Sequence, residues 1–382
     1  MIYLDNAATS FPKPPRVIEE VTRCMRSYCG NPGRGSHRLA MECAERIYQC
    51  REEAARFLGV PDPTRVIFTM NTTMSLNIAI KGLLRQGDHV LISDLEHNAV
   101  HRPIYKLARE GRITYDVFPS GVNDPFFTPA ALCVRIARMI HPNTRMLIMT
   151  HTSNVCSFAF PLEEIGALCQ RKGILFVVDA AQSAGHLPID LQKMKIDALC
   201  LPGHKGLLGP QGSGILALRE GIEAETLLEG GSGFHSLDPD MPPDAPERYE
   251  AGTLSTPAIV GLLEGIREIQ RRGIDSIQGH VCALNTRLRE HLSSIPGVTL
   301  YAPHCIGSVL LFNIEGIGAD RVGELLDQRG FCLRTGFHCA ALAHKTLVTK
   351  EDGAVRVSPG IYNTSAQIDS LAEAIFTIQS KK

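Results

Sequence analysis

The sequence lacks tryptophan, an excess of charge of either sign, and any hydrophobic run long enough to cross a membrane. Lysine and arginine (39 residues) nearly balance aspartate and glutamate (40 residues), so the formal net charge is −1. A chain without a basic excess is not expected to bind nucleic acid or an anionic membrane surface. The segment Met1–Asp5 has no basic region followed by an apolar one, so no signal peptide is predicted and a cytoplasmic location is expected.

The sequence also lacks the paired cysteine spacing that is typical of zinc sites and disulfide frameworks. Its 12 cysteines are scattered, and no two of them form a C-x-x-C pair. Several lie on predicted helices, where free thiols pack as small hydrophobic groups; these are Cys24, Cys43, Cys50 and Cys169. This usage predicts a reducing compartment and no metal site.

Strand-like and helix-like patterns alternate through the first half of the chain. Short apolar runs are predicted as strands and amphipathic stretches as helices. In order, these are strand 65–69, helix 73–84, strand 89–93, helix 99–109, strand 113–118, helix 129–138, strand 145–150, helix 162–171 and strand 174–179. Repeated strand–helix units predict an α/β fold with a mostly parallel sheet between layers of helices.

A chain of 382 residues is long enough for two domains. We expect a large domain over 15–258 and a smaller α+β domain made of 1–14 and 259–382. Two helices, 14–28 and 39–58, precede the alternating region, and a helical stretch over 257–295 follows it. Strands near 309–313 and 355–358 and a final helix from residue 366 complete the smaller domain.

One lysine, Lys205, lies in a loop rich in glycine and proline. The segment Leu201–Gly214 reads LPGHKGLLGPQGSG, and this composition favours a tight loop over a helix. A lysine held there and shielded from water could form a Schiff base with an aldehyde cofactor. A solvated surface position is the alternative for any single lysine, and the upstream Asp179 favours the catalytic interpretation.

Asp179 ends the apolar run Ile174–Asp179, which is typical of a buried parallel strand. In open α/β sheets, ligands bind at the carboxyl ends of the strands. A carboxylate there could cap a helix or form an ion pair, or it could hold a proton on the ring nitrogen of pyridoxal phosphate. Together, Asp179 and Lys205 indicate that cofactor.

A phosphate site is predicted where the strand near 66–69 gives way to a helix. Thr72, Thr73 and Ser75 lie at the N-terminus of that helix, where free N–H groups and the helix dipole attract anions. Ordinary N-capping by threonine explains these residues equally well. The segment Gly212–Ala217 matches the dinucleotide pattern G-x-G-x-x-A, but it precedes a predicted strand rather than a helix, so a nicotinamide site is rejected.

Two more polar residues follow predicted strands. His97 follows the strand that ends at Ser93, and its imidazole could stack on a pyridine ring and move protons, or could only cap the next helix. Asn154 follows the strand that ends at Thr150, where its amide could bond the ring's phenolic oxygen. Because the carboxyl ends of parallel strands meet at one edge of a sheet, we expect both residues near Asp179.

Cys339 differs from the other cysteines in its surroundings. It follows Arg334 and His338 in the segment RTGFHCA. Nearby positive charge favours the thiolate, which is the nucleophile, and Gly336 predicts an exposed loop; one more packed thiol is the alternative. Farther on, Arg356 lies within a strand-like run, where a buried arginine needs a carboxylate such as that of an amino acid.

The chain resembles the class V aminotransferase family of pyridoxal phosphate fold type I, and within it the group II cysteine desulfurases and selenocysteine lyases. The resemblance covers nearly the whole chain, and the pattern RTGxHCA is specific to the group II branch. The matching segments are Tyr3–Thr9 (YLDNAAT), Arg34–His37 (RGSH), Thr72–Thr73, Glu96–His97, Ser153–Asn154, Asp179–Gln182 (DAAQ), Gly203–Lys205 (GHK), Tyr249–Thr253 (YEAGT), Arg334–Ala340 (RTGFHCA) and Tyr362–Asn363.

The resemblance implies a role for each candidate site residue. Lys205 would hold pyridoxal phosphate as a Schiff base, and Asp179 would pair with the pyridine nitrogen. His97 would stack on the ring, and Asn154 and Gln182 would contact the ring oxygen. The phosphate would be bound by Thr72, Thr73 and His204, together with Thr253 from the other subunit of a homodimer. Arg356 would bind the substrate carboxylate, Arg334, Asn154 and His37 would complete the substrate-binding set, and Cys339 would accept the sulfur.

The implied reaction converts L-cysteine to L-alanine. Lys205 would remove the Cα proton, and the Cys339 thiolate would attack the substrate sulfur and keep it as a persulfide. A sulfur-acceptor protein or a small thiol would then take the sulfur, as in iron–sulfur cluster assembly. Two alternatives stay open: a lyase or aminotransferase, such as a selenocysteine lyase, in which Cys339 is auxiliary, and a non-catalytic sulfur-carrier scaffold.

Two positions depart from the family pattern. Pro202 stands where a serine usually helps to hold the phosphate, so one hydroxyl donor is lost. Phe337 stands where a histidine is frequent, and an apolar neighbour would favour the thiol over the thiolate at Cys339. Ser75 or a water molecule could replace the lost hydroxyl donor, and a less nucleophilic Cys339 would make cysteine a less suitable substrate.

Overall fold

The structure of the protein is a computed structural model that describes residues 1–33 and 35–381. Arg34, the first residue of the RGSH segment, lies outside the described residues. The helices are α1 (Pro15–Ser27), α2 (Arg38–Leu58), α3 (Thr72–Leu83), α4 (Asn98–Arg109), α5 (Pro129–Arg138), α6 (Leu162–Lys172), α7 (Thr256–Arg272), α8 (Ile274–Ser293), α9 (Ala319–Asp327), α10 (Ala341–Thr346) and α11 (Ser365–Ser380), with a 3-10 turn at Pro63–Arg65. The strands are β1 (Ile2–Tyr3), β2 (Val66–Thr69), β3 (Asp88–Ser93), β4 (Ile113–Phe118), β5 (Thr144–Thr150), β6 (Leu175–Asp179), β7 (Ala198–Pro202), β8 (Gly214–Leu218), β9 (Val298–Tyr301), β10 (Leu310–Ile314), β11 (Phe331–Cys332), β12 (Arg334–Gly336) and β13 (Ala354–Val357).

The larger sheet has seven strands in the order β2-β8-β7-β6-β5-β3-β4. Its neighbouring strands are parallel except at β8, which is antiparallel to both β2 and β7. Strands β6, β7 and β8 are buried along their whole length, as apolar runs are when helices cover both faces. The predicted α/β fold with a mostly parallel sheet is confirmed, and the G-x-G-x-x-A segment runs into strand β8 rather than a helix.

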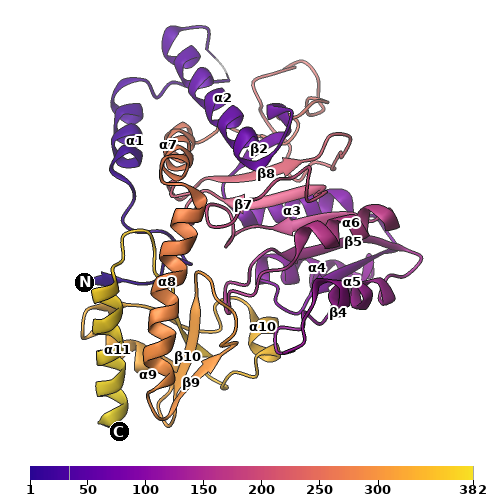
Figure 1. Cartoon of the computed structure of the whole chain (residues 1–382). Coiled ribbons are helices and arrows are strands. Elements are labelled where there is room, and N and C mark those ends of the chain that lie inside the picture. The colour runs from indigo at the N-terminus through magenta and orange to yellow at the C-terminus, as the bar shows by residue number, and fades with distance from the viewer. Residues whose placement is uncertain (34, 382) are drawn as a thin grey trace.

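Two hydrophobic clusters fill the spaces between this sheet and its helices. On one face, α3 and α4 contribute side chains such as Leu76 and Ile104. On the other face, α2, α5, α6 and α7 contribute side chains such as Ile47, Ile136 and Ile165. Figure 1 shows the resulting sandwich of the strands between helices.

A smaller sheet has four antiparallel strands in the order β12-β13-β10-β9. Helices α8, α9 and α11 pack with it, and its core includes Leu4 from the N-terminal segment. That segment reaches this region because β1 pairs in parallel with β11 and Asp5 bridges Ser358. Both termini therefore lie beside the smaller sheet (Figure 1).

The helical stretch predicted over 257–295 is two helices rather than one. Gly273 lies between α7 and α8 with a φ of 82°, a conformation that glycine adopts without strain and that ends a helix. Helix α7 packs against α1 and α2, whereas α8 packs against α11. The boundary expected at residue 258 falls inside α7, and the division into two domains stays a prediction.

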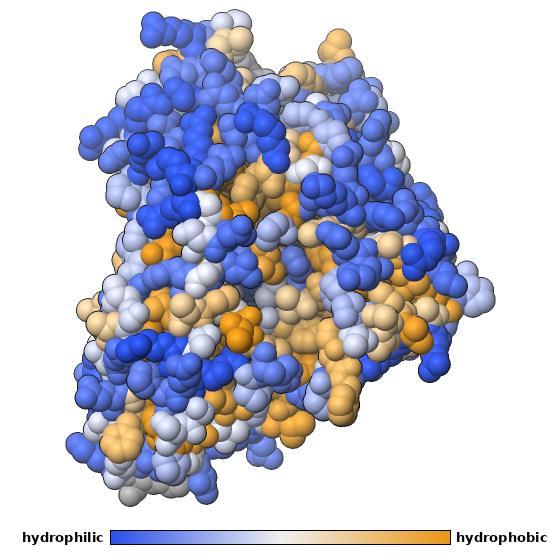
Figure 2. Space-filling model, viewed as in Figure 1, coloured by the Kyte–Doolittle hydropathy of each residue, from blue (hydrophilic) through white to orange (hydrophobic). Residues whose placement is uncertain are grey.

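The helices and the cysteines agree with two expectations from the sequence, the lack of a membrane-spanning segment and the packing of free thiols inside helices. Within 1–33 and 35–381, no helix combines the length and the apolar character needed to cross a membrane. Hydrophobic residues gather around a hollow on the face shown in Figure 2, between the part that carries α2 and the part that carries the smaller sheet. The four cysteines expected inside helices are free and buried; these are Cys24, Cys43, Cys50 and Cys169.

Candidate active site

Six strands of the larger sheet end at one edge, because β2, β3, β4, β5, β6 and β7 run in the same direction and only β8 is reversed. Thr150, the last residue of β5, is paired with Asp179, the last residue of β6. The loop after β7 carries Lys205, and Gly206 lets it approach the loop after β6, since a Cβ at Gly206 would collide with the backbone oxygen of Ala184. The topology therefore brings the loops with the predicted cofactor residues together.

Lys205 and Asp179 form the charged centre of this edge. Burial raises the pKa of Asp179 to about 6, opposed by the N–H of Ala181, 2.9 Å from Oδ1, and by the Lys205 ammonium. Burial likewise lowers the pKa of Lys205 to about 8, and the nearby Asp179 opposes that fall. An amine with this pKa is partly unprotonated at neutral pH, as attack on an aldehyde requires.

A second lysine, Lys13, also has a low pKa, about 8, through burial. Its Nζ donates hydrogen bonds to Ser10 Oγ at 2.7 Å and to the backbone oxygen of His204 at 2.8 Å. These bonds anchor Lys13 to the neighbouring chain, whereas Lys205 interacts with the carboxylate of Asp179. A lowered pKa alone does not single out Lys205; its carboxylate neighbour does.

His97 is the N-cap residue of α4. Its Nδ1 accepts the N–H of Ala99 at 3.0 Å, so the ring proton lies on Nε2 when the imidazole is neutral. Burial lowers the pKa of His97 to about 4, and the charges of Lys205 and Arg334 add to this effect. His97 therefore makes the helix cap that was the alternative interpretation, and a neutral ring is also suited to the predicted stacking on a pyridine.

Glu96 fixes the loop that carries His97. Sequence analysis named Glu96 only as part of the Glu96–His97 motif and assigned it no role. Its buried carboxyl accepts the N–H of Thr150 at 2.9 Å and a hydrogen bond from the hydroxyl of Ser93. Burial raises the pKa of Glu96 to about 8, so the group is mostly protonated at neutral pH. Glu96 thus joins the ends of β3 and β5 without placing a full negative charge beside Asp179.

Asn154 and Gln182 are buried at the same edge. The amide of Asn154 donates to the backbone oxygen of His338 at 2.8 Å, and that of Gln182 donates to the backbone oxygen of Ala7 at 3.0 Å. Each amide nitrogen has a second hydrogen that remains available to a ligand oxygen. Gln182 also lines one small cavity together with Lys205.

The N-terminus of α3 is capped by asparagine and not by a threonine. The side chain of Asn71 accepts the N–H of Met74 at 3.0 Å. Thr73 is exposed, whereas Thr72 is buried and its hydroxyl has no partner among the described residues. A free hydroxyl beside the unpaired N–H groups of a helix N-terminus suits an anion such as a phosphate.

His204 and Pro202 lie near that position at the end of β7. The Nδ1 of His204 is 3.1 Å from Thr9 Oγ1, and burial lowers the pKa of His204 to about 4, so its ring is neutral at pH 7. Pro202 is paired with Gly214 of β8. Ser75, expected as a third hydroxyl donor, is instead fully buried and donates to the backbone oxygen of Ile215 at 3.0 Å.

Arg356 is buried in β13 and already has one carboxylate partner. Its Nη2 donates to Asp5 Oδ1 at 2.7 Å, and its Nη1 donates to the backbone oxygen of Asn154 at 3.1 Å. Its Nε has no partner among the described residues. Sequence reasoning missed Asp5, which lies in the YLDNAAT segment. A guanidinium has five N–H donors, so Arg356 keeps donors for a second carboxylate.

The loop between β12 and α10 holds Cys339 against the strand ends. The backbone oxygen of Cys339 accepts the N–H of Asn98 at 2.7 Å, next to His97. The backbone oxygen of the preceding His338 accepts the amide of Asn154. His338 and Cys339 have φ values of 51° and 56°, which makes the turn tight. Cys339 is exposed, so its thiol is accessible.

Arg334 supplies the positive charge beside this thiol, with Nη2 3.4 Å from Sγ. His338 does not contribute a charge as expected, because burial lowers its pKa to about 2 and its Nδ1 contacts His344 Nε2 at 3.0 Å. The expected apolar shielding by Phe337 is also wrong. Phe337 is 47% exposed and packs edge-on against His344, so it leaves Cys339 open to solvent.

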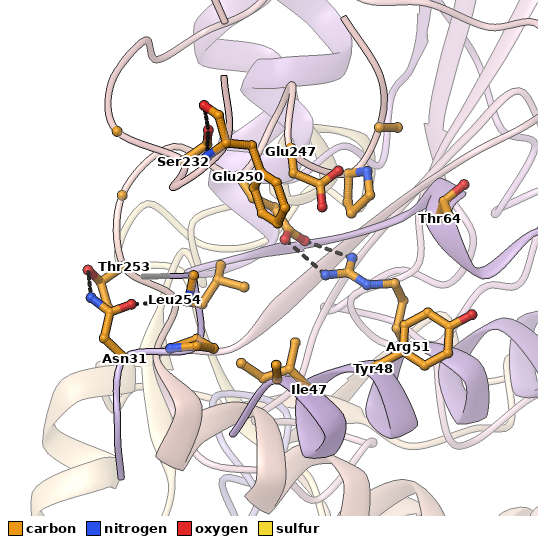
Figure 3. Close-up of a pocket in the computed structure, with 18 residues that line it drawn as sticks. Asn31, Ile47, Tyr48, Arg51, Thr64, Ser232, Glu247, Glu250, Thr253 and Leu254 are labelled. Atoms are coloured by element: carbon orange, nitrogen blue, oxygen red, sulfur yellow. Dashed lines mark hydrogen bonds and ion pairs between the residues drawn. The ribbon is translucent and has the colours of Figure 1, made fainter. Parts of the chain in front are cut away.

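Two candidate residues lie apart from these groups. Among the described residues, no hydrogen bond joins His37 or Thr253 to the strand-end site; His37 caps α2 through the N–H of Ala40 at 3.3 Å. Thr253 lines a pocket of about 290 Å³ shown in Figure 3 and accepts a hydrogen bond from Asn31 at 3.4 Å. In the same pocket Arg51 and Glu250 form a buried ion pair at 2.8 Å (Figure 3).

The chain matches the family model of aminotransferase class-V over residues 2–371. It belongs to the aminotransferase class-V family. It is 35% identical to a probable cysteine desulfurase from Methanothermobacter thermautotrophicus, over 98% of this chain and 94% of the relative. It is 31% identical to a cysteine desulfurase from Salmonella agona, over 99% and 93% of the two chains.

Solved structures agree with this assignment. The apo structure of a cysteine desulfurase from Thermococcus onnurineus superposes with a TM-score of 0.90 at 29% identity, covering 100% of this chain and 95% of the other. A cysteine desulfurase from Escherichia coli, in an S-sulfonic acid form, gives a TM-score of 0.87 at 28% identity over 98% and 93% of the chains. The class-V fold therefore extends over the full length of the chain.

The strand-end site of this class-V protein offers the groups that pyridoxal phosphate needs. An amine is available for the aldehyde, a buried carboxylate for the ring nitrogen, and a helix N-terminus for the phosphate. Buried polar atoms without a partner in the described part of the chain are rare in proteins and point to a polar ligand. Near these strand ends they are Thr72 Oγ1, Glu96 Oε2, His151 Nδ1, Thr152 Oγ1, His186 Nδ1 and Arg356 Nε. The residues present fit this cofactor.

Proposed function

We propose that the protein is a pyridoxal phosphate-dependent cysteine desulfurase, which converts L-cysteine to L-alanine and keeps the sulfur as a persulfide on Cys339. The observation that carries the proposal is the Cys339 loop, which is hydrogen-bonded to Asn98 and Asn154 at the edge that holds Lys205. The names of the relatives support cysteine as the substrate. The accessible thiol beside Arg334 supports its role as the nucleophile.

Each cofactor contact in the proposal uses a group described above. Lys205 Nζ would bind the aldehyde carbon, and the Asp179 carboxylate would hold the proton on the ring nitrogen. Pyridoxal phosphate, when bound, withdraws electrons from the substrate Cα. The remaining contacts are His97 on the ring face, Asn154 and Gln182 at the ring oxygen, and Thr72, Thr73 and His204 at the phosphate.

Lys205 also serves as the base. With the substrate bound, Lys205 Nζ would accept the Cα proton, and a pKa of about 8 suits a base that works near neutral pH. Arg356 holds the substrate carboxylate with the donors that Asp5 and Asn154 leave unused. Arg334 completes the positively charged side of the substrate site.

Cys339 then removes the sulfur. Its thiolate attacks the substrate Sγ, so an S–S bond forms while the Cβ–Sγ bond breaks. The electron pair of the broken bond stays on the three-carbon fragment, which leaves as alanine after protonation. Because Cys339 is exposed, an acceptor thiol from solution or from a sulfur-acceptor protein can reach the persulfide.

The proposal also covers the oligomeric state, the cellular compartment and the use of the sulfur. Thr253 and His37, which lie apart from Lys205, would complete the site of the other subunit in a homodimer, with Thr253 at the phosphate and His37 in the substrate-binding set. The twelve free cysteines favour a reducing, cytoplasmic compartment. Supply of sulfur to iron–sulfur cluster assembly is a use that this chemistry would serve.

Incubating the purified holoprotein with L-cysteine, and separately with L-selenocysteine, tests the proposed function. We expect alanine release from cysteine and a mass gain of one sulfur atom on the peptide that contains Cys339. Alanine release from selenocysteine alone, with no sulfur on that peptide, would contradict the proposal and favour a selenocysteine lyase.

The pKa of Lys205 predicts how the apoprotein captures the cofactor as pH changes. With a pKa of about 8, about one amine in ten is unprotonated at pH 7, against about one in three thousand for an ordinary lysine. The rate of capture should therefore rise about tenfold per pH unit below 8 and level off above it. Stopped-flow absorbance of apoprotein mixed with pyridoxal phosphate measures this profile. A rate that keeps rising to pH 10 would show that Lys205 is not shifted.

Asp179→Asn should move that profile to lower pH. The Asp179 carboxylate favours the protonated form of Lys205, so its loss lowers the Lys205 pKa below 8. Asp5→Asn is a graded control, because Asp5 acts on Lys205 in the same direction but more weakly. A midpoint unchanged in Asp179→Asn would mean that the two side chains do not interact.

A further inference from the structure

Two histidines and one aspartate meet at the opposite end of the larger sheet from the strand-end site. His89 is the second residue of β3, Asp116 lies in the edge strand β4, and His141 precedes β5. One nitrogen of each histidine and one oxygen of Asp116 all lie within 4.8 Å of one another. None of the three residues has a part in the proposed function. We propose that His89, Asp116 and His141 bind a divalent transition-metal ion, best suited to Zn²⁺.

The spacing of the three side chains matches the size of such an ion. Asp116 Oδ2 lies 3.4 Å from His89 Nε2 and 3.4 Å from His141 Nε2. This is long for a hydrogen bond. Zinc bonds of about 2.0–2.2 Å in a tetrahedron place two ligand atoms roughly 3.3–3.5 Å apart. These two separations are close to the distance between two ligand atoms on a tetrahedral zinc ion.

His89 directs toward this position a buried nitrogen that makes no hydrogen bond to the described residues. The residue is 1% exposed, and its Nε2 makes no hydrogen bond to any described residue. Its other nitrogen, Nδ1, lies 2.8 Å from Thr144 Oγ1, and that oxygen also accepts the backbone N–H of His141 at 2.7 Å. If Nδ1 donates its proton to Thr144, the lone pair of Nε2 faces Asp116. Metal-binding histidines are typically oriented by such a bond from the second nitrogen.

The backbone holds the two histidines in place. The N–H of His89 donates to the backbone oxygen of Asn143, in the turn that carries His141, at 2.9 Å. Between His89 and Val90 the pairing with β5 shifts register, as at a β-bulge, and bulges often redirect side chains next to binding sites. The turn is therefore held against the start of β3.

Binding requires one rearrangement, and it is available to His141. The rings of His89 and His141 are stacked, with centroids 4.1 Å apart and planes inclined by 16°. Two nearly parallel rings cannot both point a lone pair at one ion, so one ring must turn. His89 is buried, whereas the His141 side chain is 50% exposed and free to rotate toward the ion.

The ligand set selects the kind of metal. Two imidazoles and one carboxylate suit Zn²⁺, Ni²⁺ or Cu²⁺, whereas Ca²⁺ and Mg²⁺ prefer oxygen ligands alone. Three protein ligands leave a fourth position for water. An ion bound here would link β3, β4 and the turn before β5 at the edge of the sheet, and it would stabilise the folded chain.

Calorimetric titration of the chelator-treated holoprotein with Zn²⁺ tests the site. Asp116→Asn and His141→Ala should each weaken binding by at least about tenfold, and Zn²⁺ should raise the melting temperature of the parent protein more than that of either variant. Both side chains are about half exposed (45% and 50%), so neither change opens the core.

His291→Ala is the matched control. His291 pairs with Asp369 on the surface at 3.0 Å, a histidine–aspartate pair without a second histidine, so this variant should bind Zn²⁺ as the parent does. No measurable binding to the parent protein would overturn the proposal. Equal affinity in the parent and all three variants, as zinc held by the exposed thiols of Cys29 and Cys339 would give, would overturn it as well.

Discussion

Lys205→Ala should lower the rate of alanine formation from L-cysteine by about 10³-fold or more. A positioned proton-transfer group contributes about 10²–10⁴-fold to a rate, and Lys205 is proposed to hold the cofactor as well. The variant should also lose the covalent link, so that gel filtration removes pyridoxal phosphate from it. Alanine release and the absorbance of the bound cofactor measure the two effects.

Lys13→Ala is the control for this prediction. Lys13 is the second lysine with a pKa of about 8. An effect caused by the loss of any lysine with a low pKa would therefore appear in both variants. We expect Lys13→Ala to keep the covalently bound cofactor. Loss of the covalent link in Lys13→Ala and its retention in Lys205→Ala would reverse the assignment.

Cys339→Ala should lower alanine formation from L-cysteine by about 10³-fold or more and abolish persulfide formation. A positioned nucleophile acts like a free thiol at about 10⁵ M or above, which millimolar thiol in the buffer cannot replace. The bound cofactor should remain, because Cys339 is proposed to act on the substrate sulfur and not to bind the cofactor. Alanine release and the mass of the labelled peptides report the two losses separately.

Cys29→Ala is matched to this variant, since Cys29 is the other exposed cysteine among the described residues. It should keep both alanine release and the persulfide. If Cys339→Ala still converts L-cysteine to alanine at the parent rate, sulfur removal does not need this thiol, and the protein is a lyase in which Cys339 is auxiliary.

The sequence predicted the fold well because its signals are local. Alternating apolar runs and amphipathic stretches mark the strands and helices from β2 to β6, and Gly212–Gly214 was correctly separated from a dinucleotide site because the next residues form a strand. The break at Gly273 was missed, because helical periodicity continues on both sides of it.

The site was predicted in part, since the carboxyl ends of parallel strands share one edge. That rule placed Asp179, His97 and Asn154 together. It could not pair Arg356 with Asp5, because the two residues are 351 positions apart in the chain. Nor could it show that burial keeps His338 neutral and leaves Arg334 as the charge beside Cys339, since burial depends on packing around the whole loop.

The proposed metal site escaped sequence analysis for the same reason. His89, Asp116 and His141 come from three separate elements, so no short spacing links them. Cysteine spacing had suggested that the chain holds no metal site. Parallel pairing of β3 with both β4 and β5 brings the three side chains together.

The central claim is that Lys205, beside Asp179, is the amine that holds the cofactor. Reduction of the holoprotein with borohydride fixes such a bond, and mass spectrometry of the digest then identifies the modified lysine. The account predicts a pyridoxyl group on the peptide that contains Lys205 and none on the peptide that contains Lys13. A pyridoxyl group on Lys13, or on no lysine at all, would contradict it.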